Sequence, residues 1–286
     1  MTQTAKSLKL LICLMLATFW LLSGFAIDLM PAYVQPKLSH SAGTSIEAYI
    51  KSQGGEVTLV YHDLITGEEY LINPDRARRA ASTIKLPLVM QVMDLISRHR
   101  LDPDEKLAYH GYQYNGGSGV IQYQRVGTRF TICDLIQKAV IYSDNIAFVM
   151  LRDRVGKASF IQYIKNIGGQ YAYPGGANVT SARDLSTYAE RLYNDAKTDA
   201  NARQLIDYLK HTKYNETIPA GIKEVPVAHK AGWMPELGVS NDVAIVYDRH
   251  PYTLAIMTNG YSYSQSQTVI AHVASLVNKY HKQKYQ

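Results

Sequence analysis

The protein has 286 residues, of which 47% are hydrophobic and 19% charged, a composition typical of a globular protein that excludes a mainly disordered chain. The formal net charge is +6, but lysine and arginine form no continuous run, so we expect a basic surface and no nucleic-acid partner. The cysteines are Cys13 and Cys133, and no spacing of His, Cys and Asp is typical of zinc. We therefore expect no intramolecular disulfide, no metal and no cofactor.

Residues 1–37 have the pattern of an export segment followed by a linker. Lys6 and Lys9 precede an uncharged apolar stretch over residues 10–27. The stretch is longer than an ordinary signal-peptide core and close to the ~20 residues of a membrane-spanning helix, while Gly24–Ala26 offers a small-residue cleavage site. Both an uncleaved membrane anchor and a cleaved leader fit this pattern. In either case we expect the rest of the chain to lie outside the cytoplasm.

Hydrophobic periodicity and turn residues predict the elements that follow the linker. The region from 80 to 211 is mostly helical in pattern. In chain order we predict a helix over residues 44–51, strands over 56–62 and 68–72, helices over 131–142, 145–155 and 181–194, strands over 225–231, 239–247 and 252–257, and a last helix over 266–280.

The predicted strands come from both ends of the chain and the helices from its middle. This order predicts an α/β fold of the α+β type, in which an antiparallel sheet is assembled from both chain ends and an all-helical domain is inserted between them. We assign residues 38–286 to one domain, with 38–79 and 220–286 in the α/β part and 80–219 in the helical part. A cleft between two such parts is a natural ligand site.

The first chemically informative motif is Ser-Thr-Ile-Lys at residues 82–85, directly before an apolar run that is typical of a helix. One helical turn separates Ser82 from Lys85, so both side chains are expected on the same side of the helix. A lysine whose pKa is depressed by burial or by positive neighbours can take the proton of a serine hydroxyl and so activate it as a nucleophile. The same four residues are compatible with a helix N-cap followed by a surface lysine.

Two further motifs also have a functional and a simpler interpretation. Ser-Asp-Asn at residues 143–145 lies between two helical segments, where it can present a hydroxyl and an amide to the cleft or act as a helix cap. Lys-Ala-Gly at residues 230–232 ends a predicted strand. There Lys230 can attract a substrate carboxylate, and Gly232 lets a ligand backbone approach closely. An ordinary strand end has the same pattern.

Taken in this order, the three motifs resemble the signature of the class A β-lactamase and penicillin-binding protein family. The resemblance covers residues 44–280 and includes Gly-Ser-Gly at residues 117–119, which is similar to the family's loop before the second motif. The resemblance implies catalytic roles for Ser82 (nucleophile), Lys85 (proton acceptor), Ser143 (proton relay to the leaving nitrogen) and Asn145 (orientation of Lys85 and substrate), and substrate-binding roles for Lys230, Ala231, Gly232 and Trp233, with an oxyanion hole made by the backbone N–H groups of Ser82 and Trp233.

The chain departs from this family pattern in two places. Ala231 stands where the family usually has a Thr or Ser hydroxyl that binds the substrate carboxylate, so we expect weaker recognition of that group. In class A β-lactamases, a long loop after the second motif carries a glutamate and an asparagine that activate the deacylating water. The corresponding stretch here, residues 168–178, is short and contains no acidic residue, and Glu190 lies well inside the next predicted helix.

The resemblance implies a penicillin-recognising serine hydrolase that acts through a Ser82 acyl-enzyme, with a peptidoglycan-like, D-alanyl-D-alanine-like peptide or a β-lactam as its partner. The missing glutamate favours the peptide, or slow turnover of β-lactams. Two alternatives remain: a class A-type β-lactamase with another water activator, and a cell-wall binding or sensing protein without turnover.

Overall fold

The computed structural model describes residues 40–171 and 173–286, so the predicted N-terminal anchor or leader lies outside the described residues. Within these two ranges, no helix is long and apolar enough to cross a membrane. The helices are α2 (His40–Ser52), α3 (Lys85–Ser97), α4 (Ile132–Ile141), α5 (Asn145–Val155), α6 (Lys157–Asn166), α7 (Ala182–Asp195), α8 (Ala200–Lys210), α9 (Ile218–Gly221) and α10 (Tyr263–Lys284). The strands are β1 (Glu56–Asp63), β2 (Glu69–Ile72), β3 (Arg78–Arg79), β4 (Lys106–Ala108), β5 (Arg129–Thr131), β6 (Val179–Thr180), β7 (Val227–Met234), β8 (Val239–Val246) and β9 (Tyr252–Asn259).

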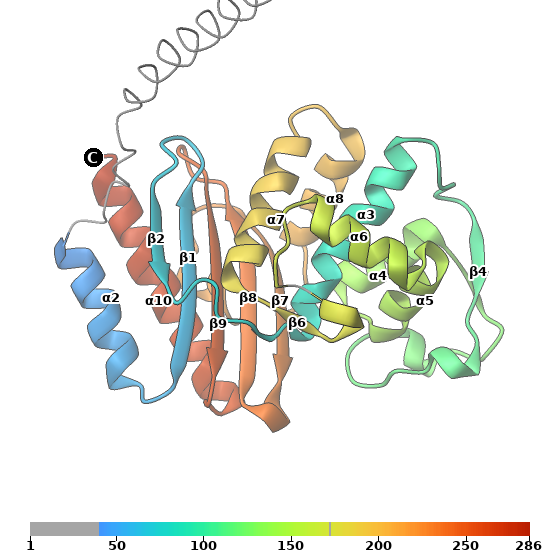
Figure 1. Ribbon diagram of the computed structural model, residues 1–286, viewed down its shortest axis with the longest axis horizontal. Helices are drawn as coiled ribbons and strands as arrows, with labels where there is room; N and C mark the ends of the chain where they lie inside the picture. Colours follow the sequence, from blue (N-terminus) through green and yellow to red (C-terminus); the bar gives the residue numbers. More distant parts are fainter. Residues whose placement is uncertain (1–39, 172) are drawn as a thin grey trace, which may run out of the picture. The chain divides into compact units, whose positions relative to one another are not determined.

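The main sheet of the described chain joins strands from both ends of the sequence. Its order is β2-β1-β9-β8-β7, and every neighbouring pair is antiparallel. The predicted fold class is therefore confirmed. Strand β7 is an edge strand, and it lies on the side of the sheet nearest to the helical part (Figure 1).

Alternation along the strands places two hydrophobic cores on opposite faces of this sheet, because successive side chains of a strand point to opposite sides. In β1, Leu59 and Tyr61 belong to a core that includes Ile46 of α2 and Val273 of α10. Val60, between them, belongs to the other core, which α7 and the inserted helices share. Helices α2 and α10 thus cover one face, and α7 covers the other (Figure 1).

The backbone at the start of α3 meets the edge of the sheet. Residues 85–93 of α3 are all buried, so the helix runs through the middle of the helical part. The turn before it is tied to β8, because the side-chain amide of Asn241 donates to the carbonyl oxygens of Arg79 at 2.8 Å and Ala80 at 3.1 Å. This anchoring fixes residue 82 at the junction between the two parts of the fold.

Candidate active site

Ser82 lies in a strained turn at the junction between sheet and helices. It belongs to the 3₁₀ turn η1 (Ala81–Ile84), which continues directly into α3. Ala81 has φ = 49°, which lies in the left-handed region. Residues other than glycine rarely adopt this conformation, which costs about 1–3 kcal/mol. The side-chain amide of Asn178 donates to the carbonyl of Ala81 at 3.3 Å, opposite the anchor from Asn241. Surrounding contacts therefore hold Ser82 in a backbone conformation that a free turn would avoid.

The amine of Lys85 is surrounded by oxygen atoms. Its Nζ lies 2.8 Å from Oγ of Ser82, 2.6 Å from the carbonyl oxygen of Ser143 and 2.7 Å from Oδ1 of Asn145. Burial, and then the charge of Lys230, hold the pKa of Lys85 well below its usual range. An uncharged amine has two N–H donors and one lone pair. The carbonyl and the amide oxygen can only accept, so they take the two donors and leave the lone pair for the Ser82 hydroxyl.

The tripeptide 143–145 is both a helix cap and part of the site. Asp144 is the N-cap of α5, and its Oδ1 accepts from the backbone N–H groups of Ile146 and Ala147, both at 2.9 Å. Its Oδ2 accepts from the N–H groups of Val120 and Ile121 at 2.6 and 2.8 Å, which ties the preceding loop to the helix. The two interpretations of this motif are therefore compatible, since the aspartate caps while its neighbours face Lys85.

Ser143 occupies a second strained position and bridges two lysines. Its φ is 51°, and its side chain is fully buried. Its Oγ lies 3.2 Å from Nζ of Lys85 and 2.9 Å from Nζ of Lys230. Ser118, in the loop noted from the sequence, donates to the carbonyl oxygen of Ser143 at 2.7 Å. The chain of short contacts from Ser82 through Lys85 and Ser143 to Lys230 provides a continuous path for protons.

Lys230 is buried on the edge strand β7 and is held from two sides. Besides Ser143, its Nζ donates to the carbonyl oxygen of Ala231 at 2.8 Å. Burial lowers the pKa of Lys230 to about 7, although the carboxylate of Asp242 acts in the opposite direction. The charge of this lysine therefore changes near neutral pH.

Gly232 is the point of closest approach between the sheet and the turn that contains Ser82. A Cβ atom at this position would lie 2.4 Å from the backbone nitrogen of Ser82, so no side chain fits. Ala231 is buried and pairs across the sheet with Asp242, while Trp233 lines the cavity above Ser82. The structure thus brings all the residues predicted from the three motifs to one place.

A cavity of about 660 Å³ opens above Ser82 and Lys85. Its volume is in the range of small-molecule sites, roughly 300–1,000 Å³. Among the described residues that line it, Glu236 is the only carboxylate. The buried Oδ1 of Asn178, another residue of the wall, has no hydrogen-bond partner in the described chain. Residues that the motif analysis missed also form the walls: Asn115, Phe148, Tyr214, Met234, Pro235 and Glu236.

The two carboxylates nearest in sequence to the loop 168–178 are engaged elsewhere. Asp184 accepts from the backbone N–H groups of Gln170 at 2.8 Å and Tyr171 at 2.9 Å, so it holds the loop in place. Glu190 pairs with His62 of β1 at 3.3 Å. Neither residue lines the cavity above Ser82. The loop therefore places no carboxylate against Ser82.

A buried histidine lies behind Lys230, on the opposite face of β7. Nδ1 of His229 lies 3.0 Å from both carboxylate oxygens of Asp242, and Nε2 lies 2.7 Å from Oγ1 of Thr212 and 3.1 Å from Oδ1 of Asn215. These contacts tie the segment that carries Tyr214, a wall of the cavity, to the edge strand. No local sequence pattern predicts this network, because its members lie on separate segments of the chain.

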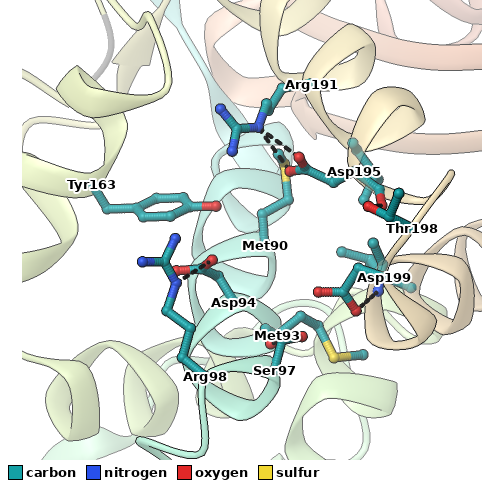
Figure 2. Close-up of a pocket in the computed structure, with 13 residues that line it drawn as sticks. Met90, Met93, Asp94, Ser97, Arg98, Tyr163, Arg191, Asp195, Thr198 and Asp199 are labelled. Carbon is teal, nitrogen blue, oxygen red and sulfur yellow. Dashed lines mark hydrogen bonds and ion pairs between the residues drawn. The ribbon is translucent and has the colours of Figure 1, made fainter.

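A second cavity, of about 290 Å³, lies among α3, α6, α7 and α8 (Figure 2). Its charged side chains pair locally: Arg98 with Asp94 at 2.9 Å, and Arg191 with Asp195 at 2.8 Å. Asp199, which also lines it, is the N-cap of α8. These groups are already used within the fold, and Ser82 and Lys85 do not line this cavity.

Comparisons with known proteins agree with this fold. A family model described as the β-lactamase enzyme family matches residues 42–281. The solved structure of PBP-A is similar, with a TM-score of 0.80 and 23% identity over 86% of this chain and 97% of that one. The structure of a PBP-A leucine-to-glutamate mutant, in an acyl-enzyme complex with penicillin G, has a TM-score of 0.79 and 24% identity over 85% of this chain and 97% of that one. The β-lactamase from Sphaerobacter thermophilus has a TM-score of 0.76 and 21% identity over 85% of this chain and 98% of that one. No curated protein matches.

Proposed function

This chain belongs to the β-lactamase enzyme family, and on that premise we propose that it is a serine hydrolase that forms an acyl-enzyme on Ser82. The proposal rests above all on one observation. Nζ of Lys85 lies 2.8 Å from Oγ of Ser82, while two acceptor-only oxygens, of Ser143 and Asn145, occupy its N–H groups. This is the arrangement that a neutral lysine needs to accept a proton from a serine hydroxyl.

The reaction that this arrangement supports is acyl transfer. Lys85 takes the hydroxyl proton as Oγ of Ser82 attacks the substrate carbonyl carbon. The backbone N–H groups of Ser82 and Trp233 stabilise the negative oxygen of the tetrahedral intermediate. When the intermediate collapses, the carbon–nitrogen bond breaks and the leaving nitrogen receives a proton from Ser143, which is replenished through the adjacent lysines. The product is an ester on Ser82, which water or an amine then attacks.

We propose D-alanyl-D-alanine-like peptides as the natural acyl donors, with β-lactams as reactive analogues. Support comes from the loop 168–178, which brings no acidic residue to the ester, and from Asp184 and Glu190, which are engaged elsewhere. A class A-type β-lactamase with another water activator, and a cell-wall sensor without turnover, are the alternatives.

The penicillin adduct on Ser82 is expected to have a half-life of many minutes at neutral pH. Deacylation needs a base beside the attacking water, and no carboxylate of the loop fills that place. Intact-mass measurement after labelling with penicillin G and dilution into excess unlabelled competitor follows the adduct directly. Release within seconds would identify a β-lactamase instead, and the absence of any adduct would favour a docking protein.

The preference for a free substrate carboxylate is expected to decline as the pH rises through about 7, because Lys230 is charged below its lowered pKa of about 7 and neutral above it. The ratio of acylation rates for penicillin G and for its methyl ester isolates this effect, since the requirement for neutral Lys85 is common to both compounds. Loss of a charge-assisted hydrogen bond should reduce the ratio about fivefold between pH 6 and pH 9. A ratio that stays constant over this range would mean that Lys230 does not recognise the carboxylate.

We also propose that the catalytic domain lies outside the cytoplasm, either anchored by the N-terminal segment or released by cleavage. The proposal rests on the order of charged and apolar residues between Lys6 and Ile27. Cell fractionation followed by mass determination of the mature N-terminus tests it.

A further inference from the structure

Three aromatic side chains meet beside the reactive serine. The rings of Tyr214 and Trp233 have centroids 4.7 Å apart at an interplanar angle of 66°, and those of Trp233 and Tyr263 lie 5.9 Å apart at 50°. Tyr214 and Trp233 line the same cavity as Ser82, and Tyr263 is 37% exposed. This aromatic cluster therefore presents ring surface to solvent at the entrance of the site.

Two exposed carboxylates flank the aromatic cluster. Glu236 lines the cavity itself, in the turn that follows β7. Glu216 lies close enough to Tyr214 and Tyr263 that its charge, after burial, raises the pKa of both phenols. Neither carboxylate forms an ion pair with another described residue. Glu236 therefore places an unpaired carboxylate in the cavity that Tyr214 and Trp233 line, while Glu216 lines a different cavity.

The two lysines of the site lie at its floor, not at its entrance. Lys85 and Lys230 are each 2% exposed, and their amines are directed to Ser143, Asn145 and other internal oxygens. Among the described residues that line the cavity, Lys85 is the only basic residue and Glu236 is the only acidic residue. A ligand that enters therefore meets negative charge first.

The order of residues along β7 indicates which part of a substrate reaches Glu236. If the substrate carboxylate lies at Lys230 and the reacting carbonyl lies between Ser82 and Trp233, the leaving group occupies the Lys230 end. The acyl portion then extends past Trp233 toward the turn that contains Glu236, since β7 is an unpaired edge along which an extended ligand can lie.

From this geometry we infer that the entrance selects acyl donors with a positively charged amine on the acyl side. Glu236 forms an ion pair with this amine, and the faces of Trp233 and Tyr214 contact it. An ammonium group over an aromatic face is attracted by its quadrupole, and Trp is the best such partner. The inference rests on the proposed acyl transfer at Ser82 and specifies its substrate class. The inference also agrees with the presence of Ala231, because Ala231 offers no hydroxyl to an anion and leaves Lys230 as the group that recognises it.

Two matched ligand pairs test the inference. Ampicillin differs from penicillin G by one amino group on the acyl side chain, and acyl-lysyl-D-alanyl-D-alanine differs from its Nε-acetyl form by one charge. We expect the charged member of each pair to acylate Ser82 about three- to tenfold faster at low ionic strength. Glu236→Gln should bring both ratios close to one, and high salt should reduce them. Glu224→Gln, which removes an exposed carboxylate that pairs with Lys282 away from the cavity, should leave them unchanged.

The outcomes separate this inference from the proposed function. Equal acylation by both members of each pair in the unmodified protein would overturn the selectivity and leave acyl transfer at Ser82 intact. If no compound acylates the protein, binding of the two lysyl peptides to Ser82→Ala, measured by calorimetry, still decides the selectivity. A preference for the charged peptide that Glu236→Gln abolishes would support it, and equal binding of both peptides would overturn it.

Discussion

Ser82→Ala is expected to abolish covalent labelling by penicillin while leaving the fold intact. The side chain of Ser82 contributes one hydroxyl to the site. The turn that holds it is fixed by the side-chain amides of Asn178 and Asn241, which donate to backbone carbonyl oxygens of residues 79–81, and not by that hydroxyl. An alanine therefore fits the same backbone but offers no atom that can form the ester. Intact-mass spectrometry after incubation with excess penicillin G measures the adduct.

Two controls make this result decisive. The circular dichroism spectrum and melting temperature of Ser82→Ala should match those of the unmodified protein, which excludes loss of label through unfolding. Ser118→Ala removes a neighbouring hydroxyl that donates to the carbonyl oxygen of Ser143 and leaves the contact between Ser82 and Lys85 in place, so labelling should persist in that variant. An adduct of penicilloyl mass on Ser82→Ala would show that another residue is the nucleophile.

Lys85→Ala is expected to slow acylation about 10²–10⁴-fold, the usual contribution of a positioned general base. Nζ of Lys85 lies 2.8 Å from Oγ of Ser82, and burial lowers the pKa of Lys85, which favours the neutral amine that can accept the proton. The acylation rate constant at low penicillin concentration, followed by mass spectrometry, measures the loss.

The interpretation of Lys85→Ala depends on the state of its neighbours. Removing the amine leaves Oδ1 of Asn145 and the carbonyl of Ser143 without that donor, so some destabilisation is expected and should appear in the melting temperature. Lys230→Ala provides the comparison, because it removes the other buried amine and leaves the contact between Lys85 and Ser82 in place. If Lys85→Ala acylates within tenfold of the unmodified protein, Lys85 is not the base.

The order of the main elements and the residues of the three motifs could be identified from the sequence, because both depend on local patterns. The continuous apolar run Leu59, Val60 and Tyr61 is typical of a strand covered on both faces, and the sheet places these side chains in two different cores. The helix predicted over 181–194 is α7, and Ser181 is its N-cap. The strands β3 and β6 were not predicted, since two residues are too short to form a periodic pattern.

Only the tertiary structure decided what these residues do together. The sequence places Ser82 and Lys85 one turn apart, but the low pKa of Lys85 arises from burial and from Lys230, which arrives on a strand from the other end of the chain. Glu236 and Tyr214 line one cavity because the fold brings their two segments together. Proton affinity and cavity shape depend on distances between segments that are remote in sequence, and no local pattern fixes those distances.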